Sequence, residues 1–140
     1  MSANNRIDEL LRSLRSSLTA LEAAQKDGLA EIASDIIRWA GVQHLSQIAI
    51  QACVDIADEV LGYMGIEEPS RSSDVFPVLA GAGVLPRDVA ESLAELFDFW
   101  FMPDRAYSQV HLNVMEVRVP VLLVSSRAFA EAVARWLMLA

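Results

Sequence analysis

Residues 39–64, WAGVQHLSQIAIQACVDIADEVLGYM, give the clearest indication of how this chain folds. It has the periodicity of one long helix with two apolar flanks. A narrow polar seam runs between the flanks, and its side chains recur at steps of three and four: His44, Gln47, Gln51, Asp55 and Asp58. A helix with a single neighbour would show a wide polar face, so this pattern predicts the central helix of a bundle, with the seam facing water or a cleft.

The composition is that of a globular protein. Of the 140 residues, 54% are hydrophobic, which argues against disorder, and we expect one domain over residues 1–140. No apolar stretch reaches the ~20 residues that a membrane helix needs, and the N-terminus lacks the apolar core of a signal peptide. We therefore expect a cytoplasmic protein without membrane contact. The single cysteine, Cys53, lies on an apolar flank and is expected in the core.

The formal net charge of −8 weighs against a protein whose whole surface attracts phosphate groups. A local basic patch remains compatible with this charge.

Helices are expected on both sides of the central one. Regularly spaced leucines predict a first helix that Asn4 or Asn5 caps and that ends near Gly28. A second helical stretch, from about Gly28 or Ser34, continues into the central helix, which stops at residues 62–65.

The next two helices are marked by their first residues. Ser72 or Ser73 is expected to cap a short helix that ends at Gly81 and Gly83. Pro86 opens a fourth helix, because proline is favoured in a first helical turn.

The C-terminal third is less regular in pattern. Residues 114–124, VMEVRVPVLLV, are rich in β-branched side chains and favour an extended segment or an edge hairpin, interrupted by Pro120. Helical periodicity returns after Ser125 or Ser126 as cap. The sequence therefore predicts an all-α antiparallel bundle of four to five helices, with an irregular segment before the C-terminal helix.

Three segments carry a resemblance to a known family. They are HLSQIAIQACVDIADEVL at 44–61, SRSSDVFPVLAGAGVLPRDVAESLAEL at 70–96 and RAFAEAVARWL at 127–137. In this order they resemble the HEPN-domain proteins of the HepT type, which are ribonuclease toxins of toxin–antitoxin pairs. The block at 72–96, with its Gly-Val-Leu-Pro turn before an acidic helix, is the most specific part.

The resemblance implies a fold, an activity and partners. The fold is an all-α HEPN bundle that forms a homodimer, in which two copies of a motif build one RNA-cleaving cleft. The activity is that of a metal-independent endoribonuclease with no cofactor. The partner is a minimal nucleotidyltransferase antitoxin, as in a type VII-like pair, which in this family adds AMP to a tyrosine beside the catalytic histidine.

The family motif joins an arginine to a histidine four to six positions further on. In the segment DRAYSQVHLN, Arg105 and His111 have five residues between them, so the resemblance assigns phosphate binding to Arg105 and proton transfer to His111. Ala106 stands where the family has a polar residue, and Asn113 where it has the modified tyrosine. Tyr107 is the candidate modification site, although an ordinary packing tyrosine is the alternative.

Other interpretations of this region stay open. An arginine and a histidine six positions apart also occur by chance as surface residues. Residues 97–126 as a whole depart from the family pattern, and a pair of compensating frameshifts would have the same effect.

The polar seam has two interpretations as well. Gln47, Gln51 and Asp55 either line the cleft, where they orient the catalytic arginine or the RNA, or form a solvated strip. Asp55 lies deepest between the flanks and, if buried, requires a partner.

For the protein as a whole, the alternative to an active toxin is a catalytically inactive binding or regulatory subunit that pairs with the nucleotidyltransferase. A third possibility is an unrelated helical adaptor.

Overall fold

The computed structural model describes residues 2–101 and 112–140, and every regular element in these ranges is a helix. The helices are α1 (Ser2–Asp27), α2 (Leu29–Ala33), α3 (Ile36–Met64), α4 (Val75–Gly81), α5 (Arg87–Trp100) and α6 (Leu112–Leu139), with the short 3-10 helix η1 (Ser72–Asp74) before α4. The predicted all-α fold is confirmed. None of the described helices is long and apolar enough to cross a membrane.

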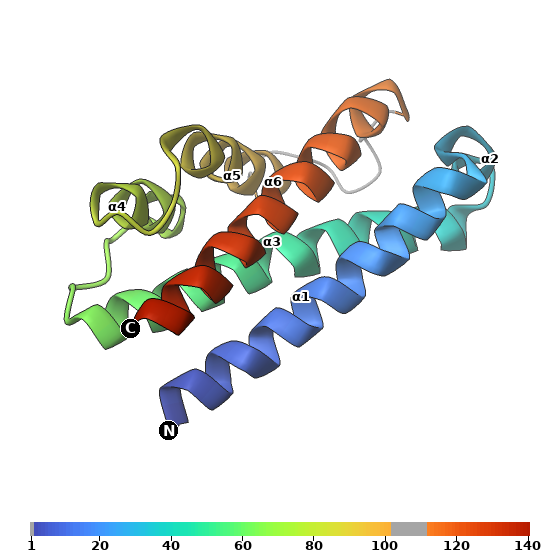
Figure 1. Ribbon diagram of the computed structural model, residues 1–140. Coiled ribbons are helices and arrows are strands. Elements are labelled where there is room, and N and C mark those ends of the chain that lie inside the picture. The colour runs from blue at the N-terminus through green and yellow to red at the C-terminus, as the bar shows by residue number, and fades with distance from the viewer. Residues whose placement is uncertain (1, 102–111) are drawn as a thin grey trace.

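Helix α3 is the centre of the bundle. It contacts each of the other five α-helices, and Figure 1 shows it beside α1 and α6, with α4 and α5 along one flank. Helix α1 runs antiparallel to α3 and α6, so the two termini of the chain lie at the same end of the bundle. Tyr63 near the end of α3 meets Trp136 near the end of α6, edge to face, with ring centroids 5.4 Å apart.

The core is mainly aliphatic and lies along the length of α3. All six α-helices contribute to its largest fully buried side chains, which include Leu14, Leu18, Ile32, Ile50, Ile56, Phe76, Leu93 and Phe129. Cys53 is fully buried among them, and burial raises the pKa of its thiol to about 12. Its expected place in the core is confirmed.

The ends of α3 are fixed by local hydrogen bonds. The second helical stretch starts after Gly28 as expected, but it ends at Ala33 as α2 and does not continue into the central helix. Helix α3 starts anew at Ile36, where the Asp35 side chain is the N-cap and accepts from the backbone N–H groups of Ile37, at 3.0 Å, and Arg38, at 3.3 Å. Gly65 ends the helix with a positive φ of 73°, which glycine adopts without steric cost. The predicted stop at residues 62–65 is confirmed.

The start of the chain differs from the prediction. Helix α1 begins at Ser2, so Asn4 and Asn5 lie inside its first turns and do not cap it. The predicted end near Gly28 is confirmed, since α1 ends at Asp27 and Gly28 has a φ of 99°.

The expectation that Ser72 or Ser73 caps the short helix is wrong, because both belong to η1 and the N-cap position of α4 is Asp74. The ends marked by glycine and proline agree with the prediction. Helix α4 ends at Gly81, and Gly83 takes a φ of 83° in the turn before α5. Pro86 precedes Arg87, the first residue of α5.

The C-terminal third corrects the expectation of an extended segment. Residues 114–124 belong to α6, with Pro120 inside the helix. Met115, Val119 and Leu122 recur at steps of four and three and are fully buried, so the helical period places them on one core-facing side. Burial of a large apolar side chain contributes roughly 1.5–3 kcal/mol, whereas a β-branched residue in a helix costs only some tenths of a kcal/mol. Packing therefore overrides the local preference for a strand.

The expectation that Ser125 or Ser126 caps the last helix is also wrong. Both serines are buried in the middle of α6. The Ser125 hydroxyl lies 2.7 Å from that of Ser92 on α5, and the Ser126 hydroxyl accepts a weak hydrogen bond from Cys53 on α3. Each hydroxyl thus has a partner on a neighbouring helix, Ser92 for Ser125 and Cys53 for Ser126, and neither serine lies at a helix end.

Candidate functional site

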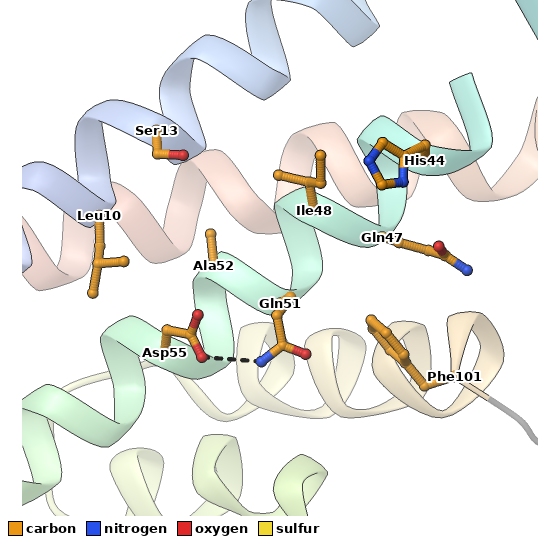
Figure 2. Close-up of a pocket in the computed structure, with 9 residues that line it drawn as sticks. All are labelled: Leu10, Ser13, His44, Gln47, Ile48, Gln51, Ala52, Asp55 and Phe101. Carbon is orange, nitrogen blue, oxygen red and sulfur yellow. Dashed lines mark hydrogen bonds between the residues drawn. The ribbon is translucent and has the colours of Figure 1, made fainter. Parts of the chain in front are cut away.

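A pocket of about 340 Å³ opens where the polar seam of α3 meets α1 and the end of α5. Figure 2 shows the side chains that line it, which come from α1, from α3 and from the residue after α5: Leu10, Ser13, His44, Gln47, Ile48, Gln51, Ala52, Asp55 and Phe101. Its volume falls within the range of about 300–1,000 Å³ that is usual for small-ligand sites.

Asp55 and Gln51 form the polar wall of this pocket. Both are half-buried, and Gln51 Nε2 donates to Asp55 Oδ1 at 3.0 Å across one turn of α3 (Figure 2). The partner that a buried carboxylate requires is thus Gln51. This bond uses one N–H of the Gln51 amide, so the second N–H stays free as a donor. The Asp55 carboxylate keeps free lone pairs beside it as acceptors.

Gln47 connects the seam to α5. Its Nε2 donates to the backbone carbonyl oxygen of Trp100 at 3.4 Å. A carbonyl in the last turn of a helix has no partner within its own helix, so this bond satisfies it and holds the end of α5 against α3. Trp100, in the part of the sequence that departs from the family pattern, is buried here.

Phe101 follows directly and forms the aromatic wall. Its ring stacks on Phe97 at a centroid distance of 4.6 Å and remains 38% exposed. An aromatic ring beside the polar wall of a pocket offers a surface for stacking.

Asp58, the last residue of the seam, lies outside the pocket lining. Its Oδ1 is shielded from solvent and has no hydrogen-bond partner among the described residues. Burial, followed by the nearby carboxylates of Glu68, Asp55 and Glu59, raises the pKa of Asp58 to about 6. The carboxyl groups of Asp55, Asp58, Glu59 and Glu68 thus lie close enough to affect one another toward the C-terminal end of α3.

The structure brings together only part of the predicted site. Gln47, Gln51 and Asp55 lie together in the pocket, with His44 exposed at its rim. Arg105, Tyr107 and His111 lie outside the described residues, so their assigned roles stay predictions.

The three lining residues that come from outside α3 were not predicted from the sequence, and neither were Ile48 and Ala52 of α3. Leu10 and Ser13 reach the pocket from α1, and Phe101 reaches it from the end of α5. The spacing of residues within one helix does not reveal which side chains of other helices face it. The only local signal was the aromatic run at residues 97–101.

The sequence also matches a known protein family. The family model described as Ribonuclease HepT-like matches residues 7–100. The chain belongs to this HepT-like family. The search of curated proteins gives no match.

Solved structures with the same fold include several toxins. The chain superposes on a mutant of the toxin–antitoxin MntA-HpeT with a TM-score of 0.81 at 17% identity, over 92% of this chain and 98% of that one. A toxin–antitoxin structure with AMP-PNP gives 0.79 at 19%, over 92% and 97%. The tri-AMPylated HEPN toxin of Shewanella oneidensis, in complex with its MNT antitoxin, gives 0.79 at 17%, over 92% and 96%. At these identities the likeness shows the shared fold.

Proposed function

We propose that this chain is the toxin of a type VII-like toxin–antitoxin pair and that it cleaves RNA without a metal ion. The observation that carries the proposal is membership of the HepT-like ribonuclease family over residues 7–100. The fold shared with HEPN toxins along nearly the whole chain supports it.

Arg105 and His111 supply the chemistry in this proposal. A guanidinium binds a phosphate through two parallel hydrogen bonds and stabilises the charge that develops during cleavage. An imidazole titrates near neutral pH and can both take and give a proton. The 2′-hydroxyl of RNA lies beside the scissile phosphate and is the nucleophile closest to hand.

The reaction then balances within the RNA. The 2′-oxygen forms a bond to phosphorus and gives its proton to a base, while the bond from phosphorus to the 5′-oxygen breaks and that oxygen receives a proton. The products carry a 2′,3′-cyclic phosphate and a 5′-hydroxyl. A substrate with one 2′-deoxy position should resist cleavage at that position.

We place the cleft between two copies of the chain. An uncharged apolar stripe on α6, formed by Val117, Val121 and Val124, supports such a dimer, since these side chains are 64%, 40% and 71% exposed. Arg118 is the one charged residue between Val117 and Val124, and it lies over the ring of Phe99 at 4.7 Å. Two chains of net charge −8 repel each other least where their surfaces are uncharged.

The cognate partner in this proposal is a minimal nucleotidyltransferase antitoxin that acts on Tyr107. The MNT antitoxin bound to the AMPylated Shewanella oneidensis toxin supports this pairing. Mass spectrometry after co-expression with the neighbouring nucleotidyltransferase tests it. We expect Tyr107→Phe to abolish the added AMP and Tyr63→Phe, at the other tyrosine, to leave it unchanged.

The direct test is cleavage of end-labelled RNA by the purified protein. We expect Arg105→Ala and His111→Ala to lower the rate at least about 100-fold, which is the usual scale for loss of an acid–base or charge-stabilising group. His44→Ala serves as the comparison, because it removes the imidazole at the pocket rim. Loss of activity with His44→Ala but not with His111→Ala would overturn the assignment of His111.

Removal of metal ions tests the mechanism separately. Cleavage in EDTA should equal cleavage in magnesium buffer, because no step assigns a role to a metal ion. Activity that disappears in EDTA and returns with a divalent cation would contradict this.

A soluble, folded protein that cleaves no RNA yet binds the nucleotidyltransferase would favour the alternative, an inactive binding or regulatory subunit.

A further inference from the structure

We propose that the pocket beside α3 is a nucleobase subsite that prefers guanine, with Asp55 and Gln51 as the specificity-determining residues. The inference rests on the proposed function, because it names what part of an RNA substrate this pocket takes.

The charge of the pocket selects a base over a phosphate. Asp55 is the one acidic side chain among the lining residues, and no lysine or arginine of the described chain lines the cavity. A carboxylate repels the phosphate backbone, so the backbone must run outside the pocket. A neutral base with hydrogen-bond donors is the part of an RNA that fits inside.

The hydrogen-bonding groups select among the bases. Asp55 Oδ1 accepts one bond from Gln51 and keeps a second lone pair, Oδ2 keeps both of its lone pairs, and Gln51 keeps one N–H as a donor. The carboxylate can therefore accept two further hydrogen bonds, one on each oxygen. Guanine presents two adjacent donors, N1–H and the exocyclic amino group, beside the O6 acceptor. Both donors can face the carboxylate while O6 accepts from the Gln51 amide.

The other bases match this pair less well. Adenine and cytosine present a single amino donor beside a ring acceptor. Uracil presents one N–H between two carbonyl oxygens, and the carboxylate repels these oxygens. The expected order is therefore guanine first, adenine and cytosine next, and uracil last.

Phe101 provides the stacking surface. Figure 2 shows its ring beyond the Gln51 amide, on the side of the pocket away from Leu10 and Ser13. Unpaired bases in protein–RNA complexes are held by stacking on aromatic rings together with hydrogen bonds to their edges. Gln47 fixes the position of this ring, since it binds the carbonyl of the preceding residue, Trp100. In the sequence, Phe101 precedes Arg105 by four residues.

The test is NMR titration of the full-length, isotope-labelled protein with the four ribonucleosides, which lack phosphate. We expect guanosine to bind at least about tenfold more tightly than uridine, because a hydrogen bond to a charged group typically contributes that factor or more. Shifts should be largest for the side-chain amide of Gln51. Equal binding of guanosine and uridine, or no binding at millimolar concentrations, would overturn the proposal.

Variants assign the preference to residues. Asp55→Asn is nearly isosteric and should abolish the preference for guanosine, whereas Asp88→Asn, an exposed acid on α5 outside the pocket, should retain it. Phe101→Ala should lower the affinity for all four nucleosides about tenfold, because every base can stack on an aromatic ring. A guanosine preference that survives in Asp55→Asn contradicts the assignment.

These results are separable from the ribonuclease activity. Guanosine binding without RNA cleavage would support the subsite and contradict the ribonuclease activity. RNA cleavage without any preference for guanosine would support the ribonuclease activity and contradict the subsite.

Discussion

At the scale of single residues, Asp58 is a carboxyl whose surroundings disfavour its charge. Its pKa is raised to about 6 by burial and by neighbouring carboxylates, against about 3.9 in an unfolded chain. Between these values the folded chain holds a proton that the unfolded chain has lost. The free energy of unfolding therefore falls as the pH rises from about 4 to 6. Above pH 6 the whole loss of stability that comes from holding Asp58 ionised in the folded chain is present.

Replacement of the Asp58 carboxyl group by an uncharged amide should remove this loss of stability. We expect Asp58→Asn to raise the free energy of unfolding by about 1 kcal/mol at pH 7.5, a figure reduced to allow for the solvent that reaches this half-buried group. The gain should shrink as the pH falls from 6 toward 4. Urea denaturation across this range measures it, with exposed Asp88→Asn as control. A gain that is the same at every pH would contradict the account.

The seam residues themselves were predictable from the sequence, because a single helix sets their spacing. Periodicity in residues 39–64 placed Gln47, Gln51 and Asp55 on one line, and the structure brings them to one pocket. Phe101 was not predictable, since its place in the pocket depends on where α5 ends against α3. The Gln47–Trp100 bond that fixes this end joins residues 53 positions apart.

At the scale of elements, α6 shows how packing decides between helix and strand. In a strand, Val117 and Val119 would point to the same face, whereas in a helix they are about 200° apart. Val119 is fully buried and Val117 is 64% exposed, as the helix requires. The β-branched run alone gave the wrong element because the burial partners of this segment lie on other helices.

This pair of valines provides a matched test of α6. We expect Val119→Ala to lower the free energy of unfolding by about 2 kcal/mol, because it removes buried methyl groups and leaves a cavity. Val117→Ala should change it by less than about 0.5 kcal/mol, since that side chain is exposed. Urea denaturation of both variants measures the difference. Equal losses at the two positions would favour the extended arrangement.

The end of α3 and the start of α5 were predictable because each carries a local signal. The glycine after α3 and the proline before α5 act within a few residues of the chain, so sequence alone located those boundaries. The cap at Asp35 was missed, although aspartate is a favoured N-cap residue, because the apolar pattern of the central helix becomes clear only several residues later.

At the scale of the whole molecule, the proposed RNA-cleaving cleft requires two copies of the chain. Light scattering should give about 31 kDa, twice the 15.4 kDa of one chain. Val121→Glu, in the uncharged stripe of α6, should shift the mass toward that of one chain because it buries a charge at the contact. Leu139→Glu, at an exposed site at the end of α6, should leave the mass unchanged. A dimer that is indifferent to Val121→Glu would place the contact on another surface.

Induced expression in a bacterial host shows whether this HepT-like chain is a toxin that cleaves RNA. Growth and the integrity of total RNA are followed for the natural chain, Arg105→Ala and His111→Ala. We expect growth arrest with RNA cleavage for the natural chain, and normal growth with intact RNA for both variants. Healthy cells with intact RNA, despite soluble and folded natural chain, would contradict it.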